Sequence, residues 1–248
     1  MSTRKHFAVE GSARKSGSVE TVLARVIAQL RAKGSARGRA ALQRFGIAAE
    51  GALGVRAAEL HRLAHAFGRS HPLALRLWRS GVHEARHLAC LVEEPGRVSE
   101  AQMERWARAF DSWSIVDCCC RYLFLDTPFA WKKAVAWSRR REVYVKRAGY
   151  VLMAYLAQHD RRATAAKLRR LLPLIHRGAS DDRRAVSTAV NWALRQIGKR
   201  SPELNRAAMA TARTLASSPL PSARWVGTHA LRELTGPAVQ RRLRASLR

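Results

Sequence analysis

The sequence is poor in acidic residues and has no long apolar run. Its 248 residues include 18 Asp and Glu against 46 Lys and Arg, so the formal net charge is +28 at pH 7. No apolar run approaches the roughly 20 residues that a membrane-spanning helix needs, and the basic N-terminus lacks an apolar signal core. These absences argue against membrane insertion and secretion, and we expect a cytoplasmic protein with no membrane partner.

Cysteines are few, and their spacing suits neither a disulfide nor a zinc site. Three of the four, Cys118 to Cys120, are consecutive, and Cys90 stands alone. Consecutive cysteines on a helix point in different directions, so they form neither a disulfide staple nor a Cys-x-x-Cys zinc motif. We expect all four to be reduced, buried and apolar in character.

Strand signals are almost absent, whereas the helix formers Ala, Leu and Arg dominate. Gly, Pro, Asp and Ser recur between segments of ordinary helix length. This pattern predicts an all-α protein, an α-solenoid of degenerate HEAT-like helical hairpins, with a compact irregular bundle as the alternative. We expect a single domain over residues 18–248, preceded by a flexible basic arm at residues 1–17.

The basic residues are spread along the whole chain and are not gathered in one tail. A surplus of this size favours a polyanionic partner, because each neutralised phosphate releases a counterion. An RNA of ribosomal type and an anionic membrane surface are the alternatives to DNA. The even spread suits a long folded surface that lies along nucleic acid.

A helix that begins near Asp182 carries one unusual aromatic residue. Its core stripe is formed by Val186, Val190, Ala193, Leu194 and Ile197. Trp192 lies off this stripe, on a polar face. That face also carries Arg184, Thr188, Arg195 and Lys199. An indole among cations is either covered by another helix or offered to a ligand such as a nucleoside.

A second unusual segment runs from Asp111 to Asp117. Asp111 or Ser112 is suited to cap a helix whose core side chains include Ile115 and Val116. Other residues of this helix, Trp113, Asp117 and Arg121, align at intervals of four on the opposite side. One interpretation of Asp117 is an ordinary ion pair with Arg121 on the same helix. The other is a functional role, because a carboxylate on a DNA-facing surface repels phosphate and is unfavourable there unless it meets a cationic group.

Several segments together resemble the AlkD-like family of DNA alkylation repair glycosylases. Trp113-xxx-Asp117 resembles the active-site tryptophan and aspartate of that family, and residues 144–148 resemble the basic start of its next buried helix. Residues 189–195 resemble the segment that carries its second tryptophan. Leu77-Trp78 followed by Glu84-Ala85-Arg86 resembles its upstream helix pair. The ordered set covers residues 20–240.

The resemblance implies a curved stack of HEAT-like hairpins whose concave, basic face holds duplex DNA. The implied substrates are purines alkylated at a ring nitrogen, such as 7-methylguanine and 3-methyladenine. The implied reaction is hydrolysis of the N-glycosidic bond without base flipping, and without a metal, another cofactor or a lyase lysine. We expect a monomer that acts on nucleoid DNA.

The resemblance also implies roles for individual residues. Asp117 is expected to stabilise the positive charge that develops on the sugar, and the faces of Trp113 and Trp192 to flank the cationic nucleoside. The residues expected to bind DNA are Arg147, Lys146, Lys132, Lys133, Arg184, Arg195 and Lys199. Ser114 stands where many family members have an acid, which bears on rate and lesion range.

The sequence leaves two alternative functions open. Some relatives are DNA binders without catalysis, and such a protein recognises bent or branched DNA through the same surface. The second alternative rests on His83, Glu84 and His87, which match the HExxH motif of zinc proteases, with Glu104 as a possible third ligand. The absence of a substrate-binding strand disfavours the protease, and we interpret the motif as polar residues on an exposed helix face.

Overall fold

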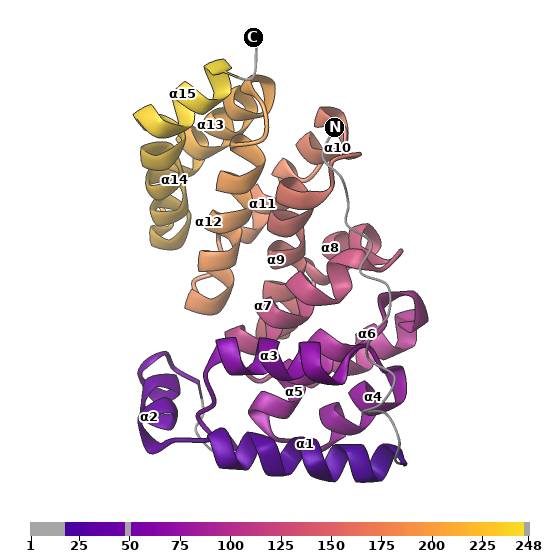
Figure 1. Ribbon diagram of the computed structural model, residues 1–248. Helices are drawn as coiled ribbons and strands as arrows, with labels where there is room; N and C mark the ends of the chain where they lie inside the picture. Colours follow the sequence, from indigo (N-terminus) through magenta and orange to yellow (C-terminus); the bar gives the residue numbers. More distant parts are fainter. Residues whose placement is uncertain (1–17, 48–50, 246–248) are drawn as a thin grey trace. The chain divides into compact units, whose positions relative to one another are not determined.

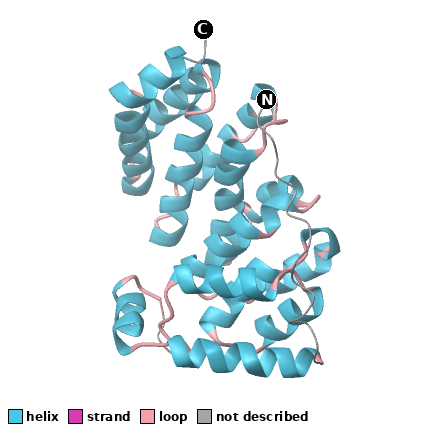
Figure 2. Ribbon diagram, viewed as in Figure 1, coloured by secondary structure: helices cyan, strands magenta, loops and turns pink. Residues whose placement is uncertain are grey.

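The computed structural model describes residues 18–47 and 51–245, and every regular element in these ranges is a helix (Figures 1 and 2). The all-α prediction is therefore confirmed for the described residues. The predicted arm at residues 1–17 lies outside them. The chain divides into two compact units, with the boundary between Glu94 and Pro95. The prediction of a single domain over residues 18–248 stays a prediction.

Within residues 18–47 and 51–94, the first unit contains five α-helices. They are α1 (Val19–Lys33), α2 (Ala36–Arg44), α3 (Ala57–Phe67), α4 (His71–Arg79) and α5 (His83–Val92). Helix α5 contacts α1, α3 and α4, and its side chains Leu88 and Ala89 are fully buried. Ser18, Ser35 and Ser70 cap α1, α2 and α4, because each hydroxyl accepts a hydrogen bond from a backbone N–H of the first turn.

The second unit contains the remaining helices. They are η2 (Pro95–Arg97), α6 (Glu100–Arg108), α7 (Trp113–Tyr122), η3 (Phe124–Asp126), α8 (Ala130–Trp137), α9 (Val143–His159), α10 (Ala165–Arg169), α11 (Leu172–Gly178), α12 (Arg184–Gly198), α13 (Pro202–Ala216), α14 (Pro221–Leu234) and α15 (Pro237–Ala245). Prolines occupy the first turn of α13 and α14, where a missing N–H costs nothing. In the described ranges, no helix is both long and apolar enough to cross a membrane.

Helix α9 is the centre of the second unit. It contacts α7, α8 and α12, and α12 in turn contacts α14 (Figure 1). Eleven of its 17 residues are buried, which follows from a sequence that is apolar on nearly all sides. Because α9 contacts helices on several sides, side chains from α7 and α12 meet those of α9, and this contact positions the candidate site.

The predicted core positions are confirmed. On α12 the five residues of the stripe, from Val186 to Ile197, are fully buried. On α7, Ile115 and Val116 are also fully buried, and Ser112 is the residue that caps the helix. All four cysteines are free and buried.

We predict that Gly149→Ala destabilises the second unit. An added Cβ would lie 2.4 Å from the backbone nitrogen of Ser138 and 2.9 Å from its Cα, so α8 and α9 would have to move apart. Overpacking of this kind costs about 2 kcal/mol, which lowers Tm by roughly 4–8 °C in a thermal unfolding experiment.

Gly96→Ala is the matched control, because a Cβ at that position meets no atom within 4 Å. If both variants melt at the same temperature as the wild type, the close approach of α8 and α9 does not limit stability.

Candidate active site

Asp117 and Arg147 form a two-pronged ion pair between α7 and α9. Nε of Arg147 donates a hydrogen bond to Oδ1 of Asp117 at 3.0 Å, and Nη2 donates to Oδ2 at 2.8 Å. The planar guanidinium matches both carboxylate oxygens, which is the strong form of this interaction. The interpretation of Asp117 as an ordinary partner of Arg121 is therefore wrong, since the carboxylate pairs across helices.

The same guanidinium also reaches α12. Nη1 of Arg147 donates hydrogen bonds to the backbone oxygen of Ala185 at 2.7 Å and to Oγ1 of Thr188 at 3.2 Å. Arg147 is 7% exposed. All three of its donor nitrogens are thus engaged, and one buried side chain joins α7, α9 and α12. Its contacts position Asp117, whereas the resemblance implies that Arg147 binds phosphates.

The carboxylate of Asp117 remains accessible. Its side chain is 23% exposed, against 9% for that of Arg147. Burial raises the pKa of Asp117 above the ordinary 3.8, and the charge and hydrogen bonds of Arg147 oppose that rise. Each oxygen accepts one hydrogen bond from Arg147 and keeps further lone-pair capacity. The carboxylate of Asp117 is therefore held in a fixed orientation and is still partly exposed at the surface.

Two aromatic side chains extend the site along α9 and α12. Trp192 is half-buried, one turn after Thr188, and its ring meets the Tyr155 ring edge-on, with centroids 4.8 Å apart at 83°. The guanidinium of Arg121 lies 5.8 Å from the centroid of Tyr155. Burial, together with the negative charge of Asp117, raises the pKa of Tyr155. Trp113, also half-buried, begins α7 one turn before Asp117.

The sequence does not single out Tyr155, because its neighbours Ala154 and Leu156 are apolar. It lies two turns after Arg147 on α9, which is the spacing that could have drawn attention to it. Tyr155 contacts both Arg121 and Trp192, and its edge-on contact limits the movement of the Trp192 indole. Trp192 is thus partly covered, and part of it stays exposed to the surface.

A second aromatic pair, which the sequence predictions do not include, lies on α14. Trp225 is 38% exposed, and its ring lies 4.6 Å from that of His229. Both line a depression of about 330 Å³ together with Thr188, which accepts a hydrogen bond from Arg147. The i, i+4 spacing of the two rings was the available signal. An exposed indole of this kind can stack against a planar ring.

The seven cations predicted to bind DNA differ in their accessibility. Arg184 is exposed, and the Lys132 side chain is 67% exposed although its ammonium pairs with Glu100 at 2.9 Å. Lys133, in contrast, is buried and holds the carboxylates of Glu100 and Glu104. That arrangement gives Lys133 a structural role between α6 and α8.

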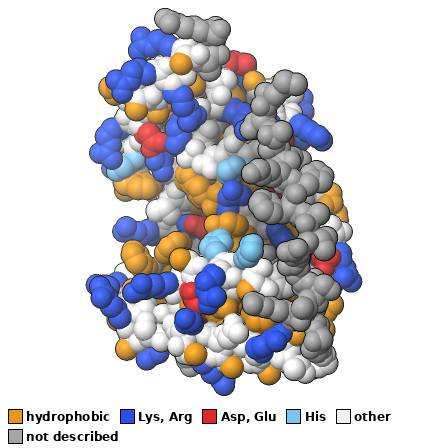
Figure 3. Space-filling model, in the orientation of Figure 1, with side chains coloured by type: hydrophobic (Ala, Val, Ile, Leu, Met, Phe, Trp, Pro, Cys, Tyr) orange, Lys and Arg blue, Asp and Glu red, His pale blue; other side chains and the backbone are white. Residues whose placement is uncertain are grey.

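The other three predicted cations form ion pairs that are partly exposed. The ammonium of Lys146 lies 2.7 Å from the carboxylate of Asp181. Arg195 and Lys199 both pair with Glu233 on α14. Over α13, α14 and α15, the face in Figure 3 shows many more basic than acidic side chains. Lys146, Arg195 and Lys199 reach phosphate only where it competes with these carboxylates.

The HExxH segment is buried, and the interpretation of it as an exposed polar face is wrong. Glu84 is 1% exposed, and its carboxylate accepts backbone N–H bonds from Leu53, Gly54 and Val55 at 2.8, 2.6 and 3.2 Å. It thereby orders the loop before α3. A carboxylate committed to three amides is not available as the general base of a protease. No cluster suited to hold a metal occurs among the described His, Cys, Asp and Glu residues.

We predict that the Asp117–Arg147 pair is energetically coupled. Arg147→Met leaves a largely buried carboxylate without its partner, which costs about 3 kcal/mol of the free energy of unfolding. The double variant with Asp117→Asn should lose less than the sum of the two single variants, because it removes both charges. Urea unfolding of the four proteins measures this difference. Losses that add within about 0.5 kcal/mol would contradict the coupling.

Comparison with known proteins supports the resemblance. Residues 26–233 match the sequence model of a family described as DNA alkylation repair enzyme. One similar solved structure is described as "A new family of proteins related to the HEAT-like repeat DNA glycosylases with affinity for branched DNA structures". It is 18% identical, with a TM-score of 0.72 over 85% of this chain and 94% of that chain, and it shows the HEAT-like fold. A search of curated proteins found no match. The chain belongs to the DNA alkylation repair enzyme family.

Proposed function

We propose that the protein is a monofunctional DNA glycosylase that removes cationic alkylated purines from duplex DNA. The substrates are purines such as 7-methylguanine and 3-methyladenine, and the product is an abasic site. The observation that carries the proposal is the carboxylate of Asp117, which is fixed by Arg147 and still 23% exposed in a protein of net charge +28. The family match and the HEAT-like fold support it.

Departure of the alkylated purine requires little catalytic help from the protein. An alkylated purine already carries a positive charge, so it leaves readily without a strong general acid. As the bond breaks, the sugar gains oxocarbenium character, and a nearby carboxylate stabilises that charge. Asp117 supplies this charge and orients the attacking water. Arg147 holds both carboxylate oxygens in place, so the negative charge need not reorganise during the reaction.

The two tryptophans contact the cationic nucleoside. The faces of Trp113 and Trp192 attract it through cation–π interactions of about 0.5–2 kcal/mol each. Tyr155 braces Trp192 from the side, which limits the motion of the indole. Contact of this kind can be made from outside the duplex, so we propose that the lesion stays stacked and is not flipped.

The exposed cations are the main candidates for contacts with DNA phosphates. Arg184, at the start of α12, and Lys132, on α8, are the most accessible of the predicted set. Such contacts fix the register of the duplex and make affinity dependent on salt. The proposal requires no cofactor and one copy of the chain, and its DNA substrate would place the protein on the nucleoid in the cytoplasm.

A second candidate function is binding of branched or bent DNA without catalysis. The solved structure of similar fold is described as having affinity for branched DNA. Ser114 replaces the acid that many AlkD-like enzymes carry beside the first tryptophan, so one negative charge is missing near Asp117. A binder would use the same cations but would have no need of an accessible carboxylate.

We predict that Asp117→Asn lowers the release of 7-methylguanine from methylated duplex by at least about a hundredfold, because the amide no longer stabilises the sugar cation. Affinity for the same duplex should stay within about threefold of the wild type, since Asp117 makes no phosphate contact. Single-turnover base release and fluorescence anisotropy measure the two quantities.

Asp126→Asn is the matched control, since it removes an exposed carboxylate from the neighbouring η3 helix. Base release should be unchanged in this variant. Equal release by wild type, Asp117→Asn and Asp126→Asn would show that Asp117 is not the functional carboxylate. An inactive wild type that binds branched duplexes tightly would favour the second candidate.

We predict an acid limb in the pH dependence of base release. The ionised form of Asp117 is the functional one, so release falls as the pH drops through its pKa. Because burial raises the pKa of Asp117, this fall begins above the pH expected for an ordinary aspartate of pKa 3.8. Arg147 lowers that pKa, so Arg147→Gln should move the limb to higher pH. Rates under single-turnover conditions test this, and a limb that does not move in Arg147→Gln would contradict the assignment.

A further inference from the structure

Two adjoining depressions are lined by residues of α8, α9, α10 and α11 and of the loops between them. Neither is lined by Asp117, Arg147 or the two tryptophans of the candidate site, although Lys132 and Lys146 of the predicted DNA-binding set line one depression each. The larger has a volume of about 520 Å³ and the smaller about 220 Å³. Arg139, Leu174 and Arg177 line both of them. The larger volume falls in the range of cavities that hold small ligands or a few side chains of a partner.

The rim of the larger depression is strongly basic. Five cations line it, namely Lys132, Arg139, Lys167, Arg170 and Arg177, and no carboxylate is among its lining residues. Arg139, Arg170 and Arg177 are exposed and make no ion pair with any described carboxylate. Like charges crowded around one hollow repel each other, so an anionic occupant is favoured there.

The floor of the same depression is apolar. It is formed by Val135, Leu171, Pro173 and Leu174. At one side Trp131 is held in place, because its indole N–H donates to Oδ2 of Asp160 at 2.8 Å and the ammonium of Lys167 lies 3.9 Å from its ring centroid. The indole at this side is thus fixed before any ligand arrives, which lowers the entropic cost of binding.

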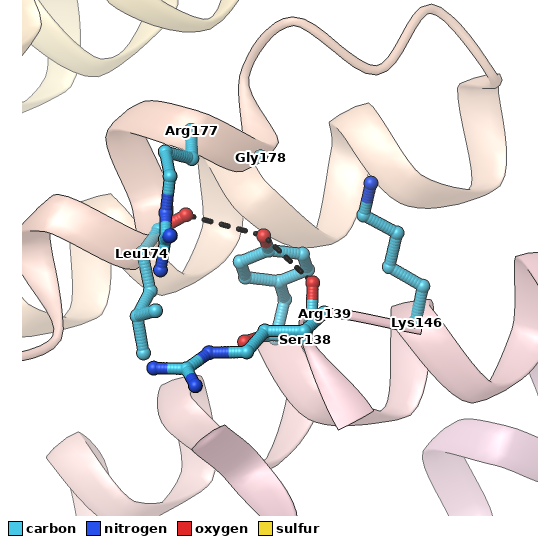
Figure 4. A pocket seen from close by; sticks show the side chains of 7 residues that line it. Ser138, Arg139, Lys146, Leu174, Arg177 and Gly178 are labelled. Carbon is cyan, nitrogen blue, oxygen red and sulfur yellow. Dashed lines mark hydrogen bonds between the residues drawn. The ribbon is translucent and has the colours of Figure 1, made fainter. Parts of the chain in front are cut away.

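The buried side chain of Tyr150 lines the smaller depression. The hydroxyl of Tyr150 bridges the backbone oxygens of Ser138 and Leu174 at 3.3 and 3.2 Å, shown as dashed lines in Figure 4. Arg139 and Arg177 extend over Leu174 in the same view. Because Arg139, Arg177 and Leu174 line both depressions, two cations lie beside an apolar side chain that the depressions share.

We propose that these depressions bind an acidic peptide segment of a partner protein, one whose acidic residues are interspersed with leucine or phenylalanine. The acidic side chains would meet Arg139, Arg170 and Arg177, and the apolar side chains would enter the larger hollow. A DNA backbone explains the rim less well, because phosphate and sugar gain little from a floor of Val135, Leu171 and Leu174. The inference does not rest on the proposed glycosylase activity, although Lys132 on the rim is also one of the proposed phosphate contacts.

The test uses the full chain and a short fluorescein-labelled peptide in which Asp alternates with Leu and Phe. One control peptide replaces Leu and Phe by Ser, and another replaces Asp by Asn. We expect the first peptide to bind at least about tenfold more tightly than either control, because the site reads both charge and apolar surface. Fluorescence anisotropy at physiological salt measures the three affinities.

The protein variant Arg139→Gln with Arg177→Gln should weaken binding of the first peptide about tenfold. Arg206→Gln with Arg213→Gln is the matched control, since it removes two exposed arginines from α13 and changes the net charge equally. Circular dichroism checks that both variants are folded.

Three results would overturn the proposal. Equal weakening in both double variants would mean that only the net charge attracts the peptide. Equal binding of the first peptide and the Ser peptide would mean that the floor takes no part. A loss of duplex DNA affinity in Arg139→Gln with Arg177→Gln that matches the loss of peptide affinity would make the depression a phosphate track.

Discussion

The ion pair between Asp117 and Arg147 is the constraint on which the site depends. A carboxylate that is largely removed from water on α7 is tolerable only with a cation held in good geometry, and Arg147 provides it from α9. The remaining nitrogen of that guanidinium reaches α12, which carries Trp192. One buried side chain therefore sets the mutual position of the three helices that carry the proposed active residues.

The carboxylate of Asp117 is significant because the rest of the protein is strongly basic. The chain has 46 basic and 18 acidic residues, so most of its surface attracts phosphate. A negative charge in such a protein lowers DNA affinity unless it meets positive charge on the bound molecule. Lys133, Lys146 and Lys199 show the more common use of acids here, since each is paired with a carboxylate that supports the fold. Asp117 differs from these acids because its partner is an arginine that holds both carboxylate oxygens and also reaches α12, the helix that carries Trp192.

Local features of this protein could be predicted from its sequence. The stripe from Val186 to Ile197, the cap at Ser112 and the buried cysteines follow from helical spacing and residue chemistry, which act over one or two turns. The partner of Asp117 could not be predicted, because Arg121 on the same helix and Arg147 thirty residues later are equally basic. The burial of Glu84 could not be predicted either, because its three amide donors lie on a loop that is about thirty residues away in the sequence.

The most direct test of the account is the identification of bases released from duplex DNA methylated at random. The account predicts that the purified protein frees 7-methylguanine and 3-methyladenine and leaves abasic sites, without added metal. If no base is released while the protein still binds the DNA, Asp117 has no chemical task and the chain acts as a DNA-binding scaffold.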